Sequence, residues 1–332
     1  MLIRYLIKRM LIAIPVLLVI SFSVFMMIQL PPGSFLDTEI ARMQQEGQVD
    51  ETKIEGLRQQ YHFDRSKTEQ YVYWIWGFVH GDLGKSFVDG TPVIDTMYQL
   101  IPLTAAISIF TILFTWSIAI PFGIFAAVKK NTIWDYTLTF TGLTAMAMPS
   151  FVIALVFMVL MKNWFPGYDP TGLISARVAD LPWYNTEYLK DLGMHLSVPI
   201  LILGIGGTAG MIRILRANVV DELRKQYVLC ARARGLHPAL VVLRYPVRVA
   251  INPFMSNIGL ILPQIISGSL IISMVLALPT LGPKQLTALL SKDTYLASSC
   301  AFVQCILAVI GVMISDVMLS VVDPRIKFEA KK

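Results

Sequence analysis

Few residues of this chain have the types and spacings that support catalysis or metal binding. The four histidines are scattered over the polar stretches, and no His, Cys or Glu lies at the short spacing typical of a metal site. They are His62, His80, His195 and His237. Each is expected to be an ordinary hydrogen-bonded surface residue. No histidine lies in the middle of an apolar block, so the sequence does not predict the nucleophile and base of an intramembrane hydrolase.

A glycine-rich run at residues 204–210 comes nearest to a nucleotide-binding motif. Its sequence is Gly-Ile-Gly-Gly-Thr-Ala-Gly, but no strand pattern precedes it and no Gly-Lys-Ser/Thr follows it. The run also lies inside an apolar block, where small residues allow two transmembrane helices to approach closely. We therefore predict a helix-packing surface here, and we expect this chain to bind no ATP and no other cofactor or metal.

The strongest indication of function is a basic segment at residues 219–253, which separates two membrane-length apolar blocks. Apolar residues recur in it at helical spacing, at Val219 or Val220, Leu223, Tyr227 and Ala231. Basic residues occupy the rest of this helix, at Arg224, Lys225, Arg232 and Arg234. Gly235 permits a bend, and Pro238 suits the first turn of a second short helix. We expect two short helices at the membrane surface that contact a soluble partner.

The overall composition is that of a membrane protein. Apolar residues make up 55% of the 332 residues and charged residues only 15%. Six apolar blocks approach or exceed the roughly 20 residues that span a bilayer. They lie near residues 9–30, 100–128, 136–161, 196–217, 251–278 and 297–322. We predict an all-α polytopic membrane protein with six transmembrane helices and both termini on one side.

The distribution of Lys and Arg predicts the orientation. The N-terminus, the 129–135 loop, the 212–250 region and the C-terminus hold 3, 2, 8 and 4 of the 28 basic residues. Because basic loops remain in the cytoplasm, both termini and the 219–253 segment are expected to be cytoplasmic. The net charge of +6 then reflects topology rather than nucleic-acid binding. The first block is too long for a cleaved signal peptide and is predicted to be a retained anchor.

These patterns divide the chain into four parts. They are the N-terminal cytoplasmic end with the first span (1–30), an extracytoplasmic region (31–99), a transmembrane core (100–322) with the 219–253 loop, and a cytoplasmic tail (323–332). Short helices and interfacial aromatic residues are expected in the second part, and an irregular loop at 163–195. The cysteines are expected to be packing residues, at Cys230, Cys300 and Cys305.

Polar residues within the apolar blocks indicate an enclosed path. Small polar groups in spanning helices need neighbours or water, which favours a bundle around a translocation path. The candidates on the fifth block are Gln264, Ser267, Ser269 and Ser273. Asp316 is the one acid well inside a predicted span, and its place near the cytoplasmic end favours a structural role over an ion-coupling role.

Together these residues resemble the B-type permease subunit of the bacterial oligopeptide/dipeptide ABC importer family. The resemblance covers nearly the whole chain. Its motifs are residues 1–9, 81–86, 226–236 with Asn252-Pro253, and 323–327. It implies a type I ABC importer permease fold with a cytoplasmic coupling helix that enters a cleft of the ATPase subunit. The coupling residues are expected to be Gln226, Tyr227, Ala231, Arg232, Ala233, Arg234, Gly235 and Leu236.

The resemblance also implies a function. The chain would be a non-catalytic permease in the bacterial cytoplasmic (inner) membrane, moving di- or oligopeptides delivered by an external binding protein. Its partners would be a homologous second permease subunit and two cytoplasmic ATPase subunits, which would bind ATP and Mg²⁺. Leu229 replaces the acidic residue that opens this loop in many ABC importers. The alternatives are a related permease for nickel or an opine-like compound, and a stand-alone secondary transporter.

Overall fold

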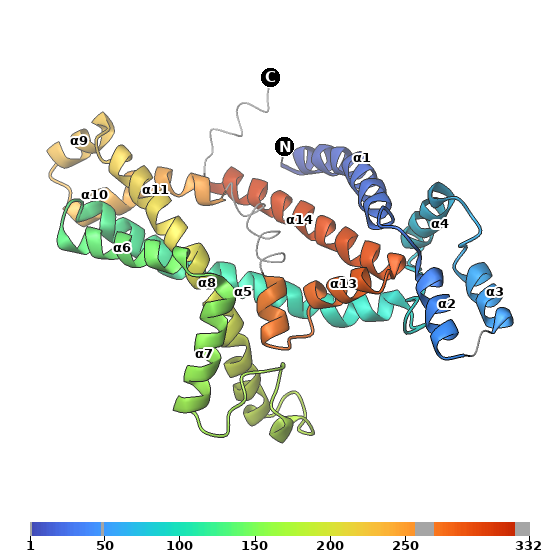
Figure 1. The fold of residues 1–332 in the computed structure, drawn as a ribbon. Helices are drawn as coiled ribbons and strands as arrows, with labels where there is room; N and C mark the ends of the chain where they lie inside the picture. The colour runs from blue at the N-terminus through green and yellow to red at the C-terminus, as the bar shows by residue number, and fades with distance from the viewer. Residues whose placement is uncertain (1, 48–49, 256–268, 323–332) are drawn as a thin grey trace. The chain divides into compact units, whose positions relative to one another are not determined.

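The structure of this chain is a computed structural model that describes residues 2–47, 50–255 and 269–322 (Figure 1). Within these ranges the chain is helical, and its one β-bridge pairs Lys85 with Pro92. The helices form two compact units. One unit comprises residues 1–6, 105–278 and 308–332, and the other comprises residues 7–104 and 279–307. We call them the coupling unit and the N-terminal unit.

Four helices of the described residues are long and apolar enough to cross a membrane. They are α1 (Leu2–Ile28), α5 (Val93–Val128), α8 (Thr186–Glu222) and α14 (Thr294–Val322). The pair α6 (Ile133–Ala147) and α7 (Ser150–Trp164) is bent by 98° and could form one broken span, which would make five. Most of the predicted span at 251–278 lies outside the described residues.

The block predicted to span the membrane at 136–161 is broken by the bend between α6 and α7. Met148 has an extended backbone, with φ −83° and ψ 130°, and Pro149 follows it. Proline has no N–H to donate and disfavours the helical conformation of the residue before it. The apolar pattern continues across this break because both helices are apolar, so hydropathy alone did not locate the bend.

Short capped helices form the polar part of the N-terminal unit, as the sequence predicted. They are α2 (Phe35–Gln45), α3 (Glu51–Gln60) and α4 (Lys67–Val79). Ser34 and Asp37 form a capping box at the start of α2, and Ser66 and Glu69 form another at the start of α4. Asp50 caps α3 by accepting hydrogen bonds from two backbone N–H groups.

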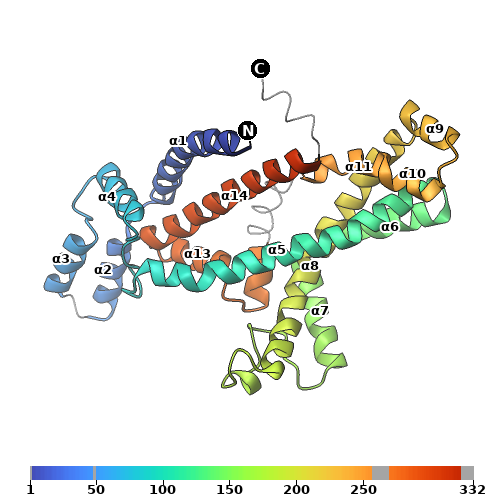
Figure 2. The ribbon, with the colours of Figure 1, turned by 180° about the vertical axis from the view of Figure 1, so that it is seen from behind.

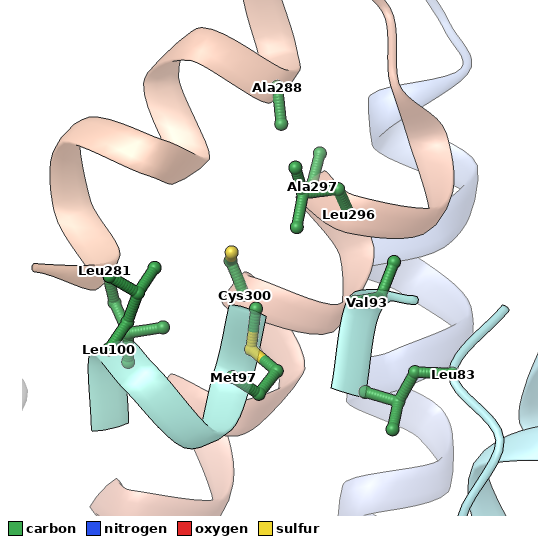
Figure 3. Close-up of a cluster of buried hydrophobic side chains, with 9 residues drawn as sticks. All are labelled: Leu83, Val93, Met97, Leu100, Leu281, Ala288, Leu296, Ala297 and Cys300. Atoms are coloured by element: carbon green, nitrogen blue, oxygen red, sulfur yellow. The ribbon is translucent and has the colours of Figure 1, made fainter. Parts of the chain in front are cut away.

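The core of the N-terminal unit joins segments that are far apart in the sequence. Figure 3 shows one cluster, in which Met97 of α5 lies beside Cys300 of α14. This cluster also contains Leu281 of α13 (Leu281–Leu290), a helix that precedes α14. A second cluster is aromatic and consists of Phe25, Tyr61, Trp74, Phe87, Tyr295 and Phe302. The N-terminal region and the start of the last span therefore share one core.

The 81–86 motif is held by a buried carboxylate. Asp293 accepts hydrogen bonds from the Ser86 hydroxyl (2.6 Å) and from the backbone N–H groups of Phe87 (2.8 Å) and Leu296 (3.1 Å). Burial raises the pKa of Asp293. Gly84 has φ +76°, and a Cβ there would lie 2.7 Å from the Tyr295 ring, so only glycine fits.

The coupling unit is packed through small residues on α5 and α8. A Cβ at Gly204 would lie 2.3 Å from Cδ1 of Phe114, and a Cβ at Gly123 would lie 3.0 Å from the Leu215 side chain. The contact of Gly204 confirms helix packing at the start of the 204–210 run, whereas a Cβ at Gly206 or Gly210 would meet no atom within 4 Å. The contacts of Gly204 and Gly123 also explain why glycine occupies a helix interior, where it is otherwise unfavourable.

The loop predicted at 163–195 is partly helical, because α8 begins at Thr186 after the N-cap Asn185. His195 is therefore in a helix, and it is buried rather than on the surface. Its Nδ1 and Nε2 atoms each lie 2.9 Å from a backbone carbonyl oxygen, of Asp191 and Asp169 respectively. The imidazole thus ties the preceding loop to the first turns of α8.

Candidate functional site: the coupling segment

The 219–253 region contains three short helices after the end of α8. They are α9 (Gln226–Ala233), α10 (Pro238–Arg244) and α11 (Pro246–Ala250). Gly235 has φ +74° between the first two, and Pro238 occupies the first turn of α10, as predicted. Figures 1 and 2 show α9 and α10 at the end of the coupling unit, near α6. We call residues 223–250 the coupling segment.

The continuous helix predicted from Val219 to Ala231 is wrong. The chain leaves α8 after Glu222, and Lys225 has an extended backbone, with φ −71° and ψ 148°, before α9 begins. This break shifts the helical phase, so Val228 rather than Tyr227 is buried. Tyr227 is 38% exposed, and its hydroxyl donates a hydrogen bond to the Glu222 carboxylate.

A small apolar core holds α9 against α10. Val228, Ala231 and Val241 are buried together, and three partly buried side chains cover them: Leu223, Leu236 and Tyr245. Of the predicted coupling residues, Ala231 and Leu236 therefore serve the packing within the segment. A side chain larger than alanine at position 231 would displace Val228 or Val241 from this core.

The other predicted coupling residues form the exposed surface of the segment. They are Gln226, Tyr227, Arg232, Ala233, Arg234 and Gly235. Sequence reasoning did not predict that four large aliphatic side chains of the same segment are exposed: Leu229, Leu240, Leu243 and Val249. Exposed leucines beside arginines are typical of a protein interface, in which the apolar residues are covered by a partner.

The coupling segment is fixed to the long helices by a second core. Val247, Ala250 and Phe254 pack with Leu215 and Val219 of α8, and with Ala119 and Ala127 of α5. This buried core fixes α11 to α8 and α5.

An ion pair joins α6 to α8 just before the segment. The Arg216 guanidinium donates to both oxygens of Asp135, with Nε to Oδ1 at 2.5 Å and Nη2 to Oδ2 at 2.6 Å. Asp135 is 1% exposed, and it also accepts a hydrogen bond from the backbone N–H of Asn131. Such bidentate pairs are strong and directional. Sequence reasoning missed this pair, because 81 residues separate its members and no local pattern connects them.

The predicted translocation-path residues lie on the segment that is only partly described. Gln264 and Ser267 fall outside the described residues, whereas Ser269 and Ser273 are buried in the chain. Their role in a path stays a prediction. In the described part of the chain, no group of three His, Cys, Asp or Glu side chains is placed to hold a metal ion.

The comparisons with known proteins define the class of this protein. The family model for the binding-protein-dependent transport system inner membrane component matches residues 119–328, and the model for the N-terminal part of these membrane components matches residues 1–108. The chain therefore belongs to this family. It is a multi-pass inner membrane permease subunit of an ABC importer.

Relatives match along the whole length of the chain. The oligopeptide transport system permease protein AppB of Bacillus subtilis (strain 168) is 29% identical over 98% of this chain and 99% of AppB. The oligopeptide permease OppB of Salmonella typhimurium is 27% identical, again over 98% and 99% of the two chains. The dipeptide permease DppB of Escherichia coli (strain K12) is 24% identical over 98% of each chain.

A solved structure supports the fold assignment. The inward-facing MetNI methionine ABC transporter contains a chain that superposes with a TM-score of 0.53, covering 69% of this chain and 96% of that one. At 17% identity this likeness establishes the fold and not the substrate. The fold is that of a type I ABC importer permease, as the sequence predicted, and a stand-alone secondary transporter is not favoured.

Proposed function

We propose that this chain is the permease subunit of an ATP-driven importer of di- or oligopeptides, which an external binding protein delivers. The observation that carries the proposal is the exposed surface of the coupling segment, because a permease without its own ATP site needs such a surface to contact an ATPase. The peptide substrate is inferred from the names of the oligopeptide and dipeptide permeases that match the chain end to end. A nickel or opine-like cargo has no comparable support.

The partners follow from this assignment. A homologous second permease subunit would complete the transmembrane path, and two cytoplasmic ATPase subunits would bind ATP and Mg²⁺. Leu229, Leu240 and Leu243 would be covered in the ATPase cleft, while the neighbouring arginines would contact the polar rim of that cleft. The segment and both chain termini would face the cytoplasm.

The mechanism would be a rigid movement of helices driven from the segment. ATP binding favours one arrangement of the ATPase dimer. This preference can change the conformation of the permease only if the ATPases and the permease helices move together. The buried contacts of α11 with α8 and α5 supply that link, and the Asp135–Arg216 pair joins α6 to the same group. Closure of the ATPases would thus tilt α5, α6 and α8 as one body.

A substitution on the exposed surface tests the coupling role. Ala233→Trp places a large side chain on exposed α9 backbone, so the subunit should fold and reach the membrane, whereas the ATPases should no longer co-purify and peptide uptake should stop. The matched control is Ala41→Trp on exposed α2, which should retain the ATPases. Wild-type co-purification and uptake by Ala233→Trp would refute the coupling role.

A competition assay tests the substrate. Proteoliposomes with the complete transporter and its binding protein should take up a labelled tripeptide, and unlabelled peptides of two to five residues should compete. Nickel or an opine-like compound should not compete. Uptake of nickel that peptides leave unaffected would reject the peptide assignment while leaving the coupling role intact.

A further inference from the structure

The N-terminal unit contains a large cavity at the end of the α1 span. Its volume is about 1010 Å³, and the residues that line it come from the end of α1, the link at 29–34, the start of α2, residues 58–70, and residues 289–294. These segments belong to one compact unit. None of the residues of the coupling segment contributes to the cavity.

The lining of the cavity has an excess of positive charge. It includes four basic side chains, Arg58, Arg65, Lys67 and Lys292, and only two carboxylates, Asp37 and Asp64. Asp37 is already engaged, because it accepts hydrogen bonds from the backbone N–H and the hydroxyl of Ser34. These bonds lower the pKa of Asp37, so its ionised carboxylate stabilises the N-terminal cap of α2.

The two lysines hold the link that leaves the membrane. Lys67 Nζ donates to the carbonyl oxygen of Gln29 at 2.6 Å, and Lys292 Nζ donates to that of Pro32 at 2.8 Å. A carbonyl oxygen is neutral and uses one of the three N–H donors of each ammonium. Among the residues that the structure describes, neither lysine lies within ion-pair distance of a carboxylate, although the charge of Lys292 also lowers the pKa of Asp37. Both lysines therefore keep N–H donors for an anion.

The surroundings of these charges are apolar and exposed. Met27, Leu30, Leu289 and Leu290 line the same cavity, and Leu30 and Leu290 are 75% and 77% exposed. The apolar span Ile7–Ile28 ends directly beside them, and only 11% of its most apolar window is buried in the chain. A membrane-spanning helix leaves the hydrocarbon core where its apolar stretch ends, so the end of this span puts the cavity at the level of the lipid headgroups.

We propose that this cavity binds the phosphate headgroup of an anionic phospholipid. The ammonium groups of Lys67 and Lys292, with Arg58 at the edge, would bind the phosphate oxygens, and the exposed leucines would contact the acyl chains. Lys and Arg side chains next to a transmembrane span attract anionic lipid headgroups, and apolar side chains beside them can contact the acyl chains. The lipid would join α1 to α4 and to the residues before α14.

Native mass spectrometry of the purified, delipidated chain in detergent tests the proposal. Phosphatidylglycerol should bind at least tenfold more tightly than zwitterionic phosphatidylcholine. Each basic side chain near an anionic lipid contributes roughly a factor of five in affinity, so Lys67→Gln with Lys292→Gln should weaken phosphatidylglycerol binding about 20-fold. The control with the same charge change, Lys53→Gln with Lys190→Gln at exposed positions outside the cavity, should bind as wild type.

A second variant separates lipid binding from the shape of the link. Arg58→Gln removes a charge that does not bond the link and that pairs with Glu55 at 3.5 Å. Because Glu55 already offsets part of this charge, the variant should weaken phosphatidylglycerol binding by about two- to fivefold. Equal binding of the two lipids, or wild-type binding by the double lysine variant, would overturn the proposal. Displacement of the lipid by millimolar inorganic phosphate or by a free peptide would also overturn it, since the cavity would then bind a soluble anion.

Discussion

The packing of α5 against α8 gives a prediction with a built-in control. In Gly204→Ala, the new Cβ would lie 2.3 Å and 2.8 Å from Cδ1 and Cε1 of Phe114. Since carbon atoms in contact lie about 3.5–4.0 Å apart, the ring must move by more than 1 Å in a packed interior. Overpacking of this kind costs about 1–3 kcal/mol. The gain in helix propensity from glycine to alanine is about 1 kcal/mol, so the net effect should be destabilisation.

The control is Gly206→Ala on the same helix. No atom lies within 4 Å of a Cβ built at Gly206, so this variant keeps the gain in propensity without a clash. Its free energy of unfolding should rise by up to about 1 kcal/mol, whereas that of Gly204→Ala should fall by up to about 2 kcal/mol. Thermal unfolding of both variants in one detergent measures the difference. Equal melting temperatures, or a more stable Gly204→Ala, would show that α5 and α8 are not in contact there.

Three further predictions concern charge and orientation. Asp135→Ala leaves the partly buried Arg216 unpaired, so urea unfolding should show a free energy of unfolding that is lower by about 3 kcal/mol. A loss below about 0.5 kcal/mol would contradict the ion pair. Burial raises the pKa of Asp293 above that of an aspartate in the unfolded chain, so the folded chain binds this proton more tightly. The melting temperature should therefore fall as the pH rises above about 4, the ordinary pKa of aspartate, and should level off once Asp293 is ionised in the folded chain. Asp293→Asn should remove this slope; an unchanged slope would exclude Asp293 as its source. An impermeant thiol reagent added to intact cells should label Tyr184→Cys and leave the native Cys230 unlabelled, and the reverse result would invert the predicted orientation.

Much of the coupling segment could be predicted from sequence because its signals are local. Gly235 sits where a left-handed backbone is needed, and Pro238 sits where a missing N–H costs nothing. The short helices of the N-terminal unit were predictable for the same reason, since Ser34 and Ser66 each form a capping box with the residue three positions further along the chain. The phase of α9 was not predictable from the apolar pattern, because the break at Lys225 moves Val228 into the position expected for Tyr227.

The sequence alone determined the properties that depend on neighbouring residues or on composition: apolar spans, a basic loop, helix caps and the absence of a phosphate-binding motif. Tertiary structure decided the properties that depend on chain segments meeting. It paired Asp135 with Arg216 and buried His195. It also placed Lys67 and Lys292 around one cavity. Hydropathy reports the cost of solvating each residue, whereas a contact between distant residues depends on how the folded helices pack, and no local pattern contains that information.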